Sequence, residues 1–177
     1  TICQGSGVAL DSATNVYVTG SLFGSANFGS GVISNTNGYY RATVFIAKYD
    51  CSGTLQWAKK GGTNGLGWGQ AIVADAYGYV YATSYKPDYG TFVFLTKYDA
   101  EGNVLWYRTA AISCCTSDYI AGYGLALDAA GNPVVTGGES GYGSFEGLGL
   151  NRQGFVVKYR ASDGAPFWIQ KLGSMGQ

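Results

Sequence analysis

Aspartates are the residues of this sequence whose types and spacing come nearest to supporting chemistry. They recur just before turns in three similar segments, as Asp11, Asp50, Asp75, Asp99 and Asp128. Carboxylate oxygens are good calcium ligands, but the spacing here matches no recognised calcium loop. An aspartate at a turn readily accepts hydrogen bonds from the backbone that follows it. We therefore expect these side chains to cap turns and expect no metal site.

Other catalytic groups are scarce. The sequence contains no histidine, which excludes Ser–His–Asp and Cys–His catalysis, histidine metal ligation and an imidazole pH switch. Only three glutamates occur, and they do not form pairs of the kind used in acid–base catalysis: Glu101, Glu139 and Glu146. The sequence therefore predicts a protein that is not an enzyme and that uses no cofactor.

Four cysteines are candidates for disulfides: Cys3, Cys51, Cys114 and Cys115. Their spacing includes no CxxC pair, so a zinc site is not indicated, whereas disulfides are the default in a surface protein. In an up-and-down meander, Cys51 lies in the turn after the third strand, whereas the other three cysteines lie at the opposite end of the strands. Cys51 is therefore separated from them by about a strand length, or about 17–20 Å. Disulfide geometry requires Cα atoms within about 7 Å. We hypothesise that Cys51 meets a cysteine of a neighbouring copy in a head-to-tail filament. The alternatives are a free thiol or a partner in a segment outside this chain.

The composition narrows the class of protein. Of the 177 residues 12% are charged, against about 25% in typical domains, which suits an extracellular or densely assembled protein. The formal net charge is zero and no basic stretch exists, so we expect no nucleic-acid partner. No apolar run reaches the ~18 residues of a membrane span. The chain begins with Thr1, and we expect a processed form or a piece of a longer protein.

The elements that must position these residues are set by an internal repeat. Its first motif is a valine- or leucine-rich run ending in aspartate, followed by a second β-type run: Val8–Asp11 with Asn15–Gly20, Val73–Asp75 with Tyr79–Thr83, and Leu125–Asp128 with Asn132–Gly137. Its second motif is Lys-Tyr-Asp or Lys-Tyr-Arg, then glycine and tryptophan: Lys48 to Trp57, Lys97 to Trp106 and Lys158 to Trp168. Three copies in the same order predict three structural units in one repeat domain, 1–177.

Each copy holds four runs rich in Val, Ile, Tyr, Phe and Thr and bounded by turn residues, which predicts a four-stranded antiparallel meander. In the first copy the runs are 7–11, 15–20, 43–49 and 54–60. The third run of each copy is apolar on both faces, as in 44–47, so sheets must pack against sheets. We therefore predict an all-β, β-propeller-like chain of three blades, incomplete or self-assembling, with blades over about 5–62, 69–111 and 122–173.

Large aromatic residues are expected to fill the wedges between blades: Trp57, Trp106, Trp168, Tyr49, Tyr98 and Tyr159. A role of the tryptophans in stacking on sugars is the alternative. The loop between the second and third strands varies most in length, spanning about 21–42 in the first copy and 138–153 in the third. Repeated insertion at one loop marks a face where partners bind.

At this point the motifs resemble a known family. The pattern Leu-Asp…Asn-Val-Tyr-Val-Thr-Gly-Ser followed by Phe-Ile-Ala-Lys-Tyr-Asp…Gly-Thr-Leu-Gln-Trp is similar to SBBP, or seven-bladed β-propeller, repeats of bacteria and archaea. The resemblance implies a secreted or cell-surface protein and no shared catalytic residues. The third copy departs from the pattern at Arg160 and Pro166, which leaves its turn geometry open. The Tyr-Asp…Gly…Trp segment also resembles quinone-dependent dehydrogenase propellers, which need a complete ring and a metal site.

Two functions remain open. Because propellers usually need four to eight blades to close, three blades indicate either a structural surface protein that assembles head-to-tail with copies of itself, or a fragment of a longer propeller. The fragment would serve in adhesion, with glycans as partners for its tyrosine-rich loops.

Overall fold

A computed structural model describes residues 2–29, 31–35, 42–62, 65–85, 90–112, 119–140, 143–149 and 152–173. Every regular element in these ranges is a β-strand, which confirms the all-β prediction. Runs rich in Val, Ile, Tyr, Phe and Thr are separated by turns, which favours antiparallel strands. No segment shows the hydrophobic period of a helix.

Blades 1 and 3 are four-stranded antiparallel sheets in which neighbouring strands follow one another along the chain. Blade 1 has the order β1-β2-β5-β6 and comprises Ile2–Leu10, Val16–Phe23, Thr43–Tyr49 and Leu55–Lys60. Blade 3 has the order β11-β12-β15-β16 and comprises Ile120–Leu127, Pro133–Glu139, Gly154–Tyr159 and Pro166–Leu172. The first strand of blade 1 begins five residues earlier than the sequence pattern indicated.

Blade 2 differs from the predicted four strands. Its own strands are β7 (Trp68–Ala74), β8 (Val80–Tyr85), β9 (Gly90–Tyr98) and β10 (Val104–Ile112). Two short strands from the variable loop of blade 3, β13 (Gly143–Phe145) and β14 (Leu148–Gly149), add to its outer edge, because β13 pairs with β10. The sheet therefore has six strands. The variable loop of blade 1 holds a similar hairpin, β3 (Ser25–Asn27) with β4 (Val32–Ser34).

The recurring aspartates close the turns. In each of the five predicted positions the carboxylate Oδ1 accepts hydrogen bonds from the backbone N–H groups two and four residues later, at 2.7–3.1 Å. The prediction that they cap turns is confirmed. In the last turn of blade 3, Arg160 stands in place of aspartate, and Asp163 takes over by accepting from the Ala165 N–H at 2.9 Å and pairing with Arg160.

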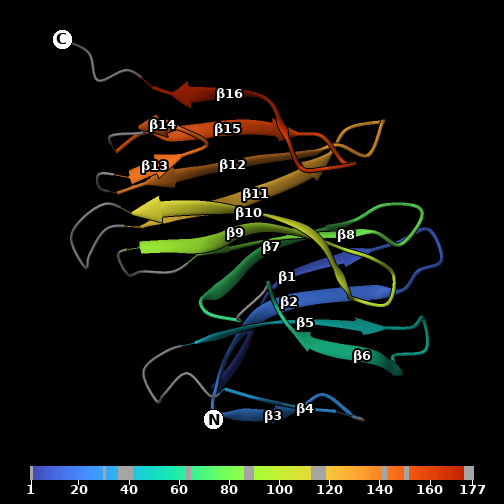
Figure 1. The fold of residues 1–177 in the computed structure, drawn as a ribbon. Coiled ribbons are helices and arrows are strands. Elements are labelled where there is room, and N and C mark those ends of the chain that lie inside the picture. The colour runs from blue at the N-terminus through green and yellow to red at the C-terminus, as the bar shows by residue number, and fades with distance from the viewer. Residues whose placement is uncertain are drawn as a thin grey trace.

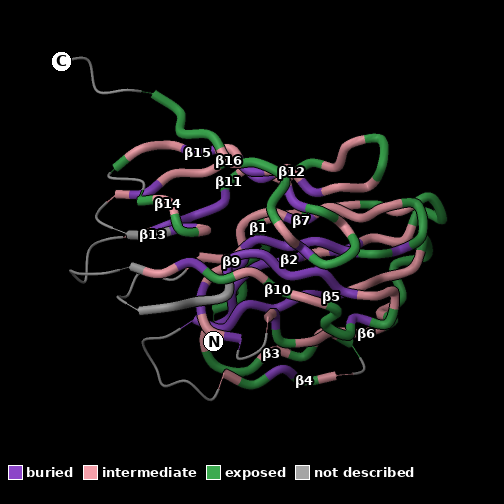
Figure 2. Tube along the Cα trace, turned by 45° about the horizontal axis from the view of Figure 1, so that its top comes forward, coloured by how far each residue is buried: buried purple, intermediate pink, exposed green. Residues whose placement is uncertain are grey.

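The three blades are stacked in chain order, with blade 2 between the other two (Figure 1). Strands β1 and β2 of blade 1 pack on β7, while β11 of blade 3 packs on β7 and β8. The third strand of blade 1 is buried on both faces, as predicted: Val44, Phe45, Ile46 and Ala47 are each at most 4% exposed. The third strand of blade 3, β15, is fully buried on one face only, because no blade of this chain follows it. Figure 2 shows the buried segments running through the middle of the stack, whereas β16 at one end is exposed.

Candidate interaction surfaces at the two ends of the blade stack

At the junction between blades 1 and 2, one tryptophan and one lysine of blade 1 contact a turn of blade 2. Trp57 on β6 donates its indole Nε1–H to the carbonyl oxygen of Ala100 at 2.9 Å, and the Lys48 ammonium reaches the same oxygen at 3.5 Å. Ala100 lies in the turn between β9 and β10 of blade 2. Gly102 in that turn is buried under the Trp57 ring, so close that a Cβ there would lie 3.0 Å from three ring atoms. A side chain here would crowd the tryptophan ring and would also have to adopt a φ of +75°.

The junction between blades 2 and 3 repeats this arrangement. Trp106 and Lys97 both donate to the carbonyl oxygen of Ala161, at 3.0 and 2.9 Å. Gly164 is buried beneath the Trp106 ring, and a Cβ there would come within 2.6 Å of a ring atom. Arg108 adds a hydrogen bond to the Gly164 carbonyl oxygen. At both junctions, therefore, a tryptophan and a lysine of one blade donate hydrogen bonds to the same turn of the next blade.

The tyrosines of the Lys-Tyr motif lie on the opposite face of each blade, toward the preceding blade. Tyr98 is 2% exposed and its hydroxyl accepts from the Gly62 N–H at 2.6 Å, while Tyr159 is fully buried. Burial raises the pKa of Tyr98 to about 12. Burial also raises the pKa of Tyr159 well above its ordinary value, with the nearby Glu146 carboxylate adding to the effect. Tyr49 in blade 1 has no blade on that side and is only half-buried.

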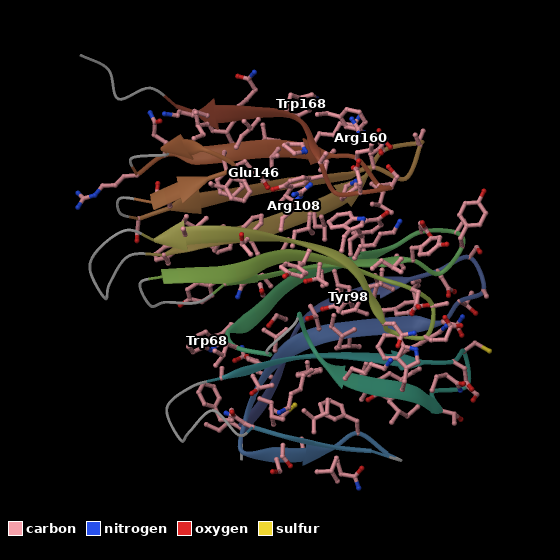
Figure 3. The ribbon with its side chains drawn as sticks, viewed as in Figure 1. Trp68, Tyr98, Arg108, Glu146, Arg160 and Trp168 are labelled. Carbon is pink, nitrogen blue, oxygen red and sulfur yellow. The ribbon has the colours of Figure 1, made fainter. Side chains whose placement is uncertain are left out.

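One end of the stack presents an unfilled copy of the tryptophan half of this junction. Trp168 on β16 occupies the position of Trp57 and Trp106, but it is 42% exposed, and Figure 3 shows it at the outermost strand of blade 3. Its indole N–H has no hydrogen bond within the described part of the chain. Lys158, at the position of Lys48 and Lys97, pairs instead with Asp128 of its own blade at 2.7 Å.

The other end presents the turn half. Cys51 and Gly53 stand where Ala100 and Gly102, or Ala161 and Gly164, receive a tryptophan. Both are exposed, and a Cβ on Gly53 would meet nothing within 4 Å. The inner strand of this face also shows apolar side chains, because Val8 and Leu10 are 67% and 60% exposed whereas the matching Ile72 of blade 2 is 5% exposed. The two ends thus carry residues at the positions that form the two halves of the internal junctions.

The β3–β4 hairpin covers part of this second face. The ring centroids of Phe28, at the end of the hairpin, and Phe45 of β5 are 4.8 Å apart, and Ile33 of β4 belongs to the same buried cluster. In blade 3 the corresponding contact joins Phe145 and Phe155 at 4.9 Å. The hairpins of blades 1 and 3 therefore occupy similar places on their blades, but only β13–β14 has a preceding blade to pair with.

The cysteines that the structure describes are both free thiols. Cys3 lies in β1 opposite Leu22, which in turn pairs with Thr43 at the start of β5, while Cys51 follows the end of β5. The two thiols are therefore at opposite ends of blade 1. Partial burial raises the pKa of Cys3. Cys114 and Cys115 lie outside the described residues, so the proposed pairing of Cys51 with a neighbouring copy stays a prediction.

The described residues were also considered as a metal site and as a membrane span. They contain no group of three or more cysteines, aspartates or glutamates close enough to hold a metal ion. None of the chain that the structure describes forms a helix long and apolar enough to cross a membrane.

Comparison with known proteins adds no relative. A scan against protein-family models finds no match, and a search of curated proteins finds none either. The resemblance to SBBP repeats therefore stays a prediction from the motifs.

Proposed function

We propose that this protein is a non-enzymatic structural protein that assembles head-to-tail, with blade 3 of one copy docked on blade 1 of the next. The observation that supports this proposal most strongly is the complementarity of the two ends. Trp168 is an unfilled donor at the position of Trp57 and Trp106, and the Cys51–Gly53 turn stands at the position of the acceptor turns. The chain builds that junction twice internally, so its geometry is already compatible with this backbone.

Apolar burial and one new hydrogen bond would contribute to association at these surfaces. Trp168, Val8 and Leu10 are each between 42% and 67% exposed. Fully burying a large apolar side chain contributes about 1.5–3 kcal/mol, and each of these contributes less because it is already partly covered. The new hydrogen bond from the Trp168 indole adds about 0.5–1.5 kcal/mol. A zero formal net charge means that copies do not repel one another strongly. These gains offset part of the entropy cost of association, which is about 4–15 kcal/mol.

Such a contact joins two different surfaces, so it yields a ring if the rotation closes and a filament if it does not. Two copies would bring together six blades, within the four to eight that propellers use. A surface filament or array is the open form of the same contact. Extracellular location is part of the proposal and is supported by the low charged fraction, 12%. If the chain is instead a piece of a longer propeller, the same two faces would receive the remaining blades.

The test is the dependence of molar mass on concentration, measured by light scattering on a sizing column. We expect the wild-type mass to rise above 18.6 kDa as concentration increases, and Trp168→Ala to shift this rise at least tenfold higher in concentration. Tyr107→Ala is the matched control, because Tyr107 is 46% exposed on β10 of the middle blade. A wild-type mass that stays monomeric up to millimolar concentration would refute self-assembly.

A further inference from the structure

The turns that join the first two strands of each blade are alike except in blade 2. In blades 1 and 3 the third and fifth residues of the turn are alanine and asparagine, as Ala13 with Asn15 and Ala130 with Asn132. In blade 2 they are Tyr77 and Tyr79. Tyr77 is 84% exposed, and the same turn closes in the other two blades without it. The two tyrosines are therefore not needed to fold the turn.

Because blade 2 has Tyr79 in place of asparagine, one carboxylate oxygen of Asp75 lacks the hydrogen bond that its counterparts receive. In blades 1 and 3 the asparagine amide donates to the second oxygen of the turn aspartate, from Asn15 to Asp11 Oδ2 at 2.8 Å and from Asn132 to Asp128 Oδ2 at 3.1 Å. Asp75 holds the turn amides through Oδ1 as its counterparts do. Its Oδ2 receives no hydrogen bond from any described residue, because a tyrosine ring stands where the amide would be.

Two further polar groups beside Asp75 have spare capacity. Tyr17 of blade 1 donates its hydroxyl to Asp11 at 3.0 Å, whereas the matching Tyr81 is fully buried and its hydroxyl has no partner among the described residues. Lys97 lies 4.3 Å from the centre of the Tyr79 ring and gives one hydrogen bond to Ala161, leaving two ammonium protons. Buried polar groups normally find partners, so this cluster is suited to a ligand.

These side chains line one cleft. It lies between the turns of blades 2 and 3, has a volume of about 660 Å³, and is bounded by Asp75, Tyr77, Tyr79 and Lys97 on one side and by Leu127 and Ala130 on the other. Sites for small molecules are typically about 300–1,000 Å³ and combine apolar walls with a few convergent polar groups.

We propose that this cleft binds a saccharide, with the apolar face of one pyranose ring against Tyr77 and the ring hydroxyls hydrogen-bonded to Asp75 and Lys97. The carboxylate accepts from sugar hydroxyls and the ammonium donates to them. The charges of Asp75 and Lys97 offset each other, and Asp128, which also lines the cleft, is paired with Lys158 at 2.7 Å. The site therefore favours a neutral sugar over an anion or a cation. The cleft lies away from both ends of the stack, so binding does not depend on self-assembly.

The test uses saturation-transfer NMR with the methyl glycosides of glucose, galactose and mannose as probes. We expect at least one to bind the wild-type chain with a millimolar dissociation constant, and Tyr77→Ala/Tyr79→Asn to weaken that binding at least tenfold. This double variant gives blade 2 the alanine and asparagine of its neighbours, so we expect it to fold, and Tyr77→Ala alone provides a second variant at an exposed position. Tyr107→Ala should leave binding unchanged. Saturation transfer to none of the three probes, or equal binding by the wild type and Tyr77→Ala/Tyr79→Asn, would overturn the proposal.

Discussion

Glycines under the tryptophan rings make the junction testable by substitution. Gly53, Gly102 and Gly164 occupy the same turn of the three blades and have similar positive φ angles of 83°, 75° and 70°. An alanine at any of them adopts a left-handed conformation, which costs about 1–2 kcal/mol. Because this cost is shared, Gly53→Ala measures the backbone cost alone, and the other two variants add only the effect of the tryptophan.

The structure ranks the three substitutions. A Cβ at Gly53 meets nothing within 4 Å, at Gly102 it lies 3.0 Å from the Trp57 ring, and at Gly164 it lies 2.6 Å from the Trp106 ring. Overpacking of this kind typically costs about 1–3 kcal/mol. We therefore expect losses of free energy of unfolding of about 1–2 kcal/mol for Gly53→Ala and about 2–5 kcal/mol for Gly102→Ala, with Gly164→Ala at least as large.

The assay is urea unfolding followed by circular dichroism and tryptophan fluorescence, at a concentration low enough for the protein to be monomeric. Since the free energy falls linearly with urea, the shift in midpoint at constant slope reports the loss directly. Equal losses for Gly53→Ala and Gly102→Ala would refute the account of the junction, because the tryptophan contact would then contribute nothing to folding.

Three further predictions concern the turns, the buried tyrosines and the thiols. Hydrogen bonds from Lys158 to Asp128 and from Ser52 to Asp50 hold the pKa of each carboxyl below 3.8. Carboxyls whose pKa is lowered on folding stabilise the fold at pH values above the unfolded pKa, so we expect the melting temperature to fall as the pH drops below about 4. An equal melting temperature at pH 6 and pH 2.5 would contradict this. Tyr98→Phe removes the acceptor of the Gly62 N–H and should cost about 1–3 kcal/mol, whereas Tyr81→Phe, whose hydroxyl has no partner among the described residues, should cost less than half as much in the same urea assay. Cys51→Ser should leave self-assembly intact, because the junction uses the backbone carbonyl of residue 51; loss of assembly in this variant, or in a reducing buffer, would instead support an intermolecular disulfide.

Local features of the fold could be read from the sequence. The aspartates that cap turns, the third strand of blade 1 that is buried on both faces, and the hairpins of the first with the second strand and of the third with the fourth each depend on residues close together in the chain. Pattern and turn chemistry therefore predict them. The hairpins β3–β4 and β13–β14 were missed, because their glycine- and serine-rich segments show no clear alternation. The pairing of β13 with β10 joins residues more than 30 positions apart, and no local pattern encodes it.

The residues of the candidate sites could likewise be predicted from the sequence only in part. The three tryptophans were identifiable from their repeat position, but their acceptors, the carbonyl oxygens of Ala100 and Ala161, are backbone atoms that carry no sequence signature. Tyr77 and Tyr79 were overlooked, although aligning the three turns residue by residue reveals them as departures from alanine and asparagine. What could not be found in this way is the open oxygen of Asp75, since it depends on where the Tyr79 ring lies.

The measurement that tests head-to-tail assembly most directly mixes two variants, each blocked at one end. Trp168→Ala removes the donor half and keeps the turn, whereas Gly53→Asn fills the turn and keeps Trp168; asparagine tolerates a positive φ, so we expect the second variant to fold. Each alone should remain at 18.6 kDa by light scattering, and the mixture should form a one-to-one complex of twice that mass. A mixture that stays monomeric, or either variant assembling by itself as wild type does, would contradict the account.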